Sequence, residues 1–511
     1  MTRWTSWLTA AALFGAALSG AAAQEGGPIE RGGVLNVAFA SDTKTLDPTF
    51  SINFSERQPL YLIYNTLLAL KPDSTIGPEL AEGWTVGGDG LALTLRLRQG
   101  VKFHDGTPFD AAAVKFNLDR RLDPAVASPQ RAQLASIIET VTIKGPLEVE
   151  LRLKTPSPGL LGMLAQREGF IASPSAIVKF GPDFARNPVG TGPFLFKEWT
   201  PGQRIVVERN PNYWESGKPY LDRIVFSDVS NAVVAIQRLI TGEVDYISAL
   251  SPSDVRQIEN RPGIRLDRSA AGRLYALQWQ VDRPPFNNEK LRQAVAYAVD
   301  RKRLVDILMA GKAPVAEVMT TPALWWHAAS VKSYPYDPAK AKALLAEAGL
   351  TSGLDVTLVT PQVSLLQQVN QLIQEQLKAI GVNARLEPVS QSDWYPRVAQ
   401  GLINFTPMRW SDRPDPDGLL TILLDSKGNQ NTTKYANPEV DALLAKGRGS
   451  TDLVERKAIY GEVQKLATRD LPYVPLFFSV EYAALRDTVR NHVWIADEIP
   501  RFREVWKAKG K

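Results

Sequence analysis

The sequence contains no cysteine and only three histidines among its 511 residues. The absence of cysteine excludes disulfides and thiolate metal sites. The histidines, His104, His327 and His492, form no H-E-x-x-H pair and no other cluster with metal-ligand spacing. We therefore expect no metal and no other cofactor, and nucleophilic and zinc mechanisms lack their usual residues.

Motifs of several other function classes are missing as well. There is no G-x-S-x-G elbow and no G-x-x-x-x-G-K-[ST] loop, and Gly190-Thr191-Gly192 lacks the third glycine of a dinucleotide fingerprint. The formal net charge of +5 is spread without a dense Lys/Arg run, which gives little support to nucleic-acid binding. Aspartate and glutamate are frequent, so a secreted hydrolase with two catalytic carboxylates remains an alternative.

Apolar runs long enough to span a membrane, about 20 residues, are also missing. Residues 1–23 instead resemble a signal peptide, with Arg3, an apolar stretch over 7–18 and a small-residue site at 21–23. We expect cleavage after about Ala23. No cysteine is present to carry a lipid anchor, so a free protein in the periplasm is expected.

What is present is typical of a soluble globular protein of two or three domains, with 44% hydrophobic and 22% charged residues. A strand over 355–360, a helix over 363–380 and a strand over 382–389 predict a β–α–β unit and an α/β class. Longer helices are predicted over 58–70 and 291–309. A strand over 472–478 is expected to return to the first lobe.

Turn and capping residues punctuate these segments. Asp110 is a predicted N-cap for a helix from Ala111, and Asp337 precedes a proline at the first helical position. His104-Asp105 lies in a turn, and we interpret this pair as structural rather than catalytic.

Residues 188–226 contain the motif GTGPF, a predicted hairpin of strands 194–199 and 204–209, and then RNPNYW. This combination resembles the signature of the extracytoplasmic solute-binding proteins of peptide-type ABC transporters, bacterial family 5. Residues 78–120, 285–304 and 334–350 resemble the same family. Recognisable motifs run from about residue 34 to about residue 480.

The resemblance implies an α/β, two-lobed periplasmic binding protein of type II, in the large peptide-binding class, with an extra domain in the first lobe. We expect residues 1–23 to be the signal peptide. Domain I, the hinge-side lobe, would comprise 33–60, 190–272 and 475–511, domain II 61–189, and domain III, the second lobe, 273–474.

The resemblance also implies a function without catalysis. The protein would capture short peptides or similar zwitterionic solutes by lobe closure and deliver them to an ABC permease in the inner membrane, acting as a monomer. Oligosaccharides, opines and nickel chelates are carried by the same fold and remain alternatives, as does a role as a sensor for a chemoreceptor.

The loop over 410–418 resembles the family's W-x-x-D-x-x-D-P-D loop, in which the first aspartate pairs with the ligand's α-ammonium. That position is Asp412 here, next to Trp410. A second interpretation makes Asp412, Asp415 and Asp417 turn and cap residues; it is favoured for Asp415 and Asp417 and stands level with ligand binding for Asp412.

Further candidate ligand contacts are an arginine, a serine and three tryptophans. Arg409 would hold a ligand carboxylate or neutralise Asp412. Trp279 precedes the domain boundary where the family has a cleft residue, and Ser41 lies in the loop that borders the cleft. Trp325 and Trp326 suit stacking on a side chain or sugar ring, although one of them filling a core is the alternative.

Overall fold

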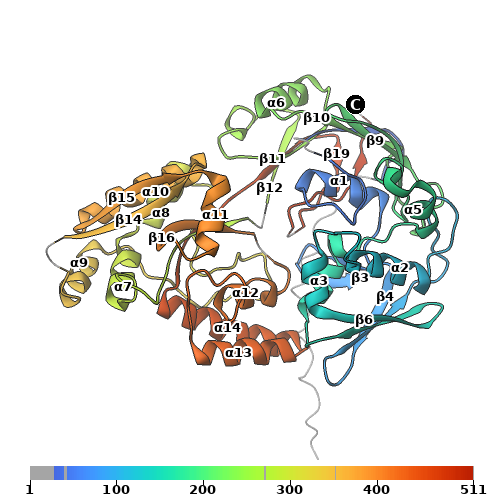
Figure 1. Ribbon diagram of the computed structural model, residues 1–511. Helices are drawn as coiled ribbons and strands as arrows, with labels where there is room; N and C mark the ends of the chain where they lie inside the picture. The colour runs from blue at the N-terminus through green and yellow to red at the C-terminus, as the bar shows by residue number, and fades with distance from the viewer. Residues whose placement is uncertain are drawn as a thin grey trace, which may run out of the picture.

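The computed structural model describes residues 28–39, 43–269, 272–350, 353–411, 413–495 and 497–509. Figure 1 shows two lobes, one containing the yellow-to-red elements α7 to α14 and the other the blue-to-green ones. The strands β11 and β12 lie between α6 and the second lobe, at the top of the view. The chain therefore has the α/β, two-lobed architecture that the sequence predicts.

Seven strands of the described chain form the sheet of the first lobe, with β1 near its middle. The spatial order is β12 (Ile264–Arg268), β18 (Tyr482–Arg486), β11 (Tyr246–Leu250), β1 (Val34–Phe39), β10 (Arg223–Asp228), β9 (Arg204–Arg209) and β8 (Phe194–Thr200). β1 pairs in parallel with β10 and β11, and the remaining pairs are antiparallel. Segments from the start, middle and end of the chain are thus tied into one sheet.

Helices cover both faces of this sheet. Residues of β1 point alternately to the two faces and so pack against helices on each side. Val37 packs in a cluster with Leu60 and Ile63 of α1 (Phe54–Ile63), whereas Ala38 packs with Ile236 and Leu239 of α6 (Ala232–Thr241). α5 (Pro174–Phe180) lies on the α1 side, where its Ile177 joins the same cluster as Val37.

The extra domain is built on a four-stranded antiparallel sheet with its own apolar core. Its strands are, in spatial order, β4 (Ala81–Val86), β5 (Ala92–Leu97), β7 (Glu148–Leu153) and β6 (Ile138–Gly145). Its helices are α2 (Ala111–Leu122), α3 (Arg131–Ile137) and α4 (Gly159–Leu164), and a small pair, β2 (Leu68–Leu70) and β3 (Ile76–Pro78), completes it. The Asp110 carboxylate accepts from the Ala113 N–H at 2.9 Å, which confirms the predicted cap.

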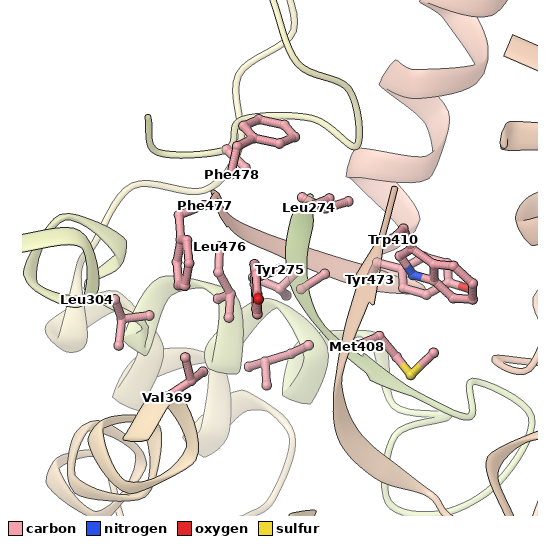
Figure 2. Close-up of a cluster of buried hydrophobic side chains, with 14 of the residues drawn as sticks. Leu274, Tyr275, Leu304, Val369, Met408, Trp410, Tyr473, Leu476, Phe477 and Phe478 are labelled. Carbon is pink, nitrogen blue, oxygen red and sulfur yellow. The ribbon is translucent and has the colours of Figure 1, made fainter. Parts of the chain in front are cut away.

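The second lobe contains a three-stranded sheet and a parallel two-stranded sheet. These are β16 (Phe405–Trp410), β13 (Leu274–Trp279) and β17 (Tyr473–Phe478), and β14 (Leu354–Pro361) with β15 (Val382–Val389). The helices are α7 (Glu289–Ala298), α8 (Arg301–Leu308), α9 (Pro338–Glu347), α10 (Ser364–Ala379), α11 (Gln391–Ala399), α12 (Leu420–Leu424), α13 (Pro438–Gly449) and α14 (Leu453–Asp470). Figure 2 shows part of the shared core, to which β13, β16 and β17 contribute side chains.

Two predicted helices differ from the structure. The helix over 58–70 ends at Ile63, because the Leu67 N–H bonds to the Gly169 carbonyl and residues 68–70 pair as β2. The helix over 291–309 is divided into α7 and α8, and the Asp300 carboxylate caps α8 by accepting from the Arg303 N–H at 2.9 Å. Apolar spacing continued through both breaks, so only the tertiary hydrogen bonds and the cap reveal them.

The strand over 472–478 also differs from expectation. As β17 it pairs with β13 and remains in the second lobe, and the following strand β18 is the one that joins the sheet of the first lobe. The chain therefore re-enters the first lobe between Phe478 and Tyr482.

The GTGPF motif lies where the chain passes directly against the backbone at the end of α1. The Gly192 N–H donates to the Ile63 carbonyl at 2.9 Å, and a Cβ on Gly192 would lie 2.3 Å from the Leu62 carbonyl oxygen. His104 fastens the same crossing, since its Nε2 lies 3.0 Å from the Gly192 carbonyl and its Nδ1 lies 3.4 Å from the Gly190 nitrogen. This placement agrees with a structural rather than a catalytic His104.

We expect Gly192→Ala to lower the unfolding free energy by about 2–3 kcal/mol, because the added methyl group meets backbone that cannot move aside. Calorimetric unfolding temperatures would measure this. Gly88→Ala is the control, since a Cβ there meets nothing within 4 Å and the turn is exposed. Equal unfolding temperatures for the two variants would contradict the close-approach argument.

Burial lowers the pKa of His104 to about 4, against an ordinary 6.5. The folded state therefore resists protonation that the unfolded chain accepts, so this stability is complete above pH 6.5 and declines by up to about 1.4 kcal/mol per pH unit down to pH 4. We expect His104→Gln to have a lower unfolding temperature at pH 7 but a shallower decline toward pH 4.5. Parallel declines for the two proteins would refute this assignment.

Candidate functional site

Two neighbouring crossovers connect the lobes. One runs from β12 to β13 and the other from β17 to β18. They are joined by hydrogen bonds from the Ser479 N–H to the Arg273 carbonyl and from the Arg273 N–H to the Ser479 hydroxyl, both at 2.9 Å. Because few residues cross between the lobes, these segments can act as a hinge.

A cavity of about 90 Å³ lies beside this hinge and is lined by both lobes. Its lining residues are Phe54, Arg57, Gln166, Gly272, Arg273, Ser411, Arg413, Asp497 and Glu498. α1 and the end of α4 supply one wall, the segment after β16 supplies the other, and the C-terminal segment contributes the two acids. We call this the hinge cavity.

Arg57 is the exceptional residue of the hinge cavity. It lies in α1, partly buried, and its Nε is enclosed without a hydrogen-bond partner in the described part of the chain. Burial lowers the pKa of Arg57; the Asp497 carboxylate and Tyr61 act in the opposite direction, and the cations of Arg167 and Arg501 reinforce the lowering. A guanidinium held in this way is pre-positioned for an anion, and its planar fork suits a carboxylate.

The carboxylate that acts most strongly on Arg57, that of Asp497, already forms an ion pair. Asp497 accepts from Arg501 at 2.6 Å, and its side chain is only 5% exposed. Arg501 in turn lies over the Tyr61 ring, 3.3 Å from its centroid. Arg501 therefore largely neutralises the charge of Asp497, and Arg57 keeps a net attraction for an external anion.

Other cations surround the same cavity. Arg273 lies at its hinge side, 3.5 Å from the Glu481 carboxylate and 40% exposed, and Arg413 lies exposed on the second lobe. Arg409 is on β16 opposite Tyr275, partly buried, and is not among the residues that line the cavity. Arg57, Arg273 and Arg413 together bring positive charge from both lobes and the hinge.

The two candidates Asp412 and Ser41 lie outside the described residues. Their outcome is therefore open, although the neighbours Ser411 and Arg413 do line the hinge cavity. Trp410 ends β16 and is 9% exposed, with its indole Nε1 enclosed and without an acceptor in the described ranges. In Figure 2 Trp410 lies on the same core cluster as Tyr473 and Met408.

The three remaining candidate tryptophans differ in how far they are buried. Trp279 is 1% exposed, donates from its indole to the Leu471 carbonyl at 2.7 Å and stacks on Phe286, which corrects the expectation of a cleft residue. Trp326 is fully buried in the core and likewise offers no surface to a ligand. Trp325 is partly exposed between the lobes, and its indole donates to the Pro414 carbonyl at 3.0 Å.

Asp415 and Asp417 act as turn and cap residues. The Asp415 carboxylate accepts a hydrogen bond from the Asp417 N–H at 2.9 Å. It also accepts hydrogen bonds from both terminal guanidinium nitrogens of Arg456, at 2.7 and 2.9 Å. Burial raises the pKa of Asp417, whose carboxylate accepts from the Thr421 hydroxyl. These bonds hold the segment that follows Ser411 in one conformation.

Sequence reasoning did not identify Arg57, Arg273 or the pair Asp497-Glu498. Arg57 occupies one position of an otherwise ordinary amphipathic helix, and the C-terminal segment has no motif. The signal that distinguishes Arg57 is the missing partner, which only the packed structure reveals. Among the described residues, no group of three or more His, Asp or Glu side chains could hold a metal ion, and no helix is long and apolar enough to cross a membrane.

Comparison with known proteins agrees with this architecture. The sequence profile of the bacterial extracellular solute-binding proteins, family 5, middle region, matches residues 75–431. The glutathione-binding protein GsiB of Salmonella paratyphi A is 33% identical over 451 residues, covering 86% of this chain and 88% of that protein.

Two solved structures are similar over almost the whole chain. HbpA2 of Haemophilus parasuis has a TM-score of 0.88 at 25% identity, covering 93% of this chain and 100% of that one. The periplasmic binding protein DppA of Helicobacter pylori, in complex with the peptide STSA, has a TM-score of 0.75 at 27% identity, covering 94% and 99%. The chain thus belongs to family 5 of the bacterial extracellular solute-binding proteins and is the substrate-binding component of an ABC importer.

Proposed function

We propose that the protein captures a short peptide carrying net negative charge, or a similar small carboxylate, and that the hinge cavity holds the ligand's charged anchor. The observation that carries this proposal is Arg57, a partly buried guanidinium whose Nε has no protein partner in the described chain. Leaving a guanidinium unsatisfied is costly, and a ligand carboxylate would remove that cost. Two unit charges 4 Å apart at an effective dielectric constant of 20 attract by about 4 kcal/mol.

The chemistry of the relative's ligand suits this arrangement. Glutathione, which GsiB is named for binding, is a tripeptide with two carboxylates and one ammonium. Arg57 on the first lobe and Arg413 on the second offer one cation to each carboxylate, and Asp412 is the proposed partner of the ammonium. Trp410, with its unpaired indole N–H, is proposed as a further donor to the ligand.

A ligand that bridges Arg57 and Arg413 contacts both lobes at once. It therefore binds the closed arrangement more tightly than the open one and shifts the population toward closure. The paired crossovers at Arg273 and Ser479 allow this motion while keeping the lobes in register. Closure without bond cleavage is the proposed mechanism.

Several further features belong to the same proposal. The chain is exported with residues 1–23 removed, works as a free periplasmic monomer and docks on an inner-membrane permease. The proposed domain I comprises residues 33–60, 190–272 and 475–511, domain II residues 61–189 and domain III residues 273–474. Residues 475–478 are an exception to domain I, because they pair in the second lobe. No catalytic step is proposed, and recovery of the bound ligand intact after incubation, by mass spectrometry, would separate this function from a two-carboxylate hydrolase.

Arg57→Gln should weaken binding of glutathione at least about 30-fold, because the variant removes a charge from a poorly hydrated site. Isothermal titration would measure it, against Arg303→Gln, whose exposed pair with Glu375 lies on the far surface of the second lobe. Arg303→Gln should bind as the wild type does.

The panel for this titration includes glutathione, a neutral trisaccharide, an acidic opine and a metal–EDTA chelate. Tight binding of the trisaccharide alone, or a carboxylate ligand indifferent to Arg57→Gln, would refute the anionic-ligand proposal. Preference for the opine or chelate with the same Arg57 dependence would keep the site and replace the peptide.

The segment after Trp410 depends on the Arg456–Asp415 pair, whose side chains are 3% and 14% exposed. Arg456→Met leaves a buried carboxylate unpaired, so we expect a loss of about 3–5 kcal/mol in unfolding free energy and weaker ligand binding. Lys465→Met, on the same helix, breaks an exposed pair with Glu462 and should change stability by less than about 1 kcal/mol. A stable Arg456→Met protein with unchanged affinity would contradict the anchoring role.

A further inference from the structure

A second cavity, of about 250 Å³, lies between the extra domain and the second lobe. The extra domain contributes Thr75, Ile76, Trp84, Val86, Gly90, Leu93, Leu153, Pro156, Ser157, Pro158, Leu161 and Gly162. The second lobe contributes Trp325, Pro414, Asp415, Arg448, Gly449, Thr451, Leu453 and Arg456. We call this the lateral cavity.

The wall formed by the extra domain is apolar. Trp84 and Leu161 are only partly buried in the domain core, and Val86 is 36% exposed. On the facing wall Leu453 is 49% exposed at the start of α14. Apolar side chains that face each other across a cavity gain free energy when an apolar group displaces water between them.

The charges at the lateral cavity are already neutralised. Arg456 and Asp415 pair with each other at two contacts, and Arg448 lies 3.4 Å from both the Asp417 and Asp425 carboxylates. The lateral cavity therefore differs from the hinge cavity in having its cations within 3.4 Å of carboxylates, whereas the Nε of Arg57 has no hydrogen-bond partner among the described residues. It favours an uncharged apolar group over an ion.

The two cavities share the same two walls. α4 presents Leu161 and Gly162 to the lateral cavity, and Gln166, which follows it, lines the hinge cavity. Across the gap, Ser411 and Arg413 line the hinge cavity while Pro414 and Asp415 line the lateral one. Gln166 follows Gly162 by four residues in a turn that continues α4, an advance of about 6 Å, so the cavities are separated by roughly two residues of extended peptide.

We propose that the lateral cavity is a specificity-determining subsite that receives the apolar side chain of the bound peptide, one or two residues from its charged anchor in the hinge cavity. An apolar cavity of about 150 Å³ accepts benzene, so 250 Å³ accommodates a leucine or phenylalanine side chain. This inference rests on the proposed function and adds a size and polarity preference to it.

The test uses two tripeptide series of constant charge, Glu-X-Gly and Glu-Gly-X, with X as Gly, Ser, Leu or Phe. The affinity of each peptide for the mature protein is measured by titration. In one of the two series, the peptides with Leu or Phe at X should bind about 10- to 100-fold more tightly than the peptide with Gly at X. Leu161→Ser should reduce this preference to below about threefold while leaving the Gly peptide's affinity unchanged.

Leu147→Ser is the matched control, since Leu147 is partly buried against the same domain core but does not line the cavity. It should keep the full preference for Leu and Phe. Equal affinity for all X in both series, or a loss in Leu161→Ser that is the same for every peptide, would overturn the subsite. The Arg57-dependent binding of the Gly peptides would persist in that case, so failure of this inference is distinguishable from failure of the proposed function.

Discussion

The contact between Gly272 and Ser479 is the constraint on which the two-lobed arrangement depends. A Cβ on Gly272 would lie 1.9 Å from the Ser479 carbonyl oxygen, so the two crossovers can approach only with glycine at this position. Two hydrogen bonds between Arg273 and Ser479, one of them to the Ser479 hydroxyl, then join the crossovers into one narrow connection. Everything that lines the hinge cavity is arranged around this connection: α1 on one side, the segment after β16 on the other.

Several arginines are paired with carboxylates within the described chain, whereas the Nε of Arg57 has no hydrogen-bond partner there. Arg501 is satisfied by Asp497, Arg167 by Glu168 and Arg456 by Asp415. Arg57 lies among these pairs with its Nε unsatisfied, and burial lowers its pKa. In the proposed mechanism an entering anion interacts with Arg57 and with the opposite lobe, which couples ligand binding to closure.

The sequence predicted several elements well because caps, turns and the alternation of strand and helix are local signals, and the resemblance to the family supplied the two-lobed arrangement. The hairpin that follows GTGPF, the Asp110 cap and the β14–α10–β15 unit all appear where the pattern placed them. Helical spacing failed over 64–70, where the apolar residues serve a strand that pairs at long range. The site was less predictable for a related reason. Trp279 and Trp326 look like ligand-stacking residues but fill the core, whereas Arg57 looks like a solvated helix residue and becomes exceptional only through the partners it lacks.

In the proposed mode of binding, the segment that carries Ser411, Arg413, Pro414 and Asp415 separates recognition by charge from recognition by shape. One side of it faces the hinge cavity, where long-range Coulomb attraction draws a ligand of the right sign but distinguishes poorly between side chains. Its other side faces the lateral cavity, where contact is short-ranged and depends on volume. Because Arg456 and Trp325 hold this segment, a substitution elsewhere in the lateral cavity need not disturb the hinge cavity. Substitutions on the extra domain can therefore alter ligand preference while the charged anchor stays intact.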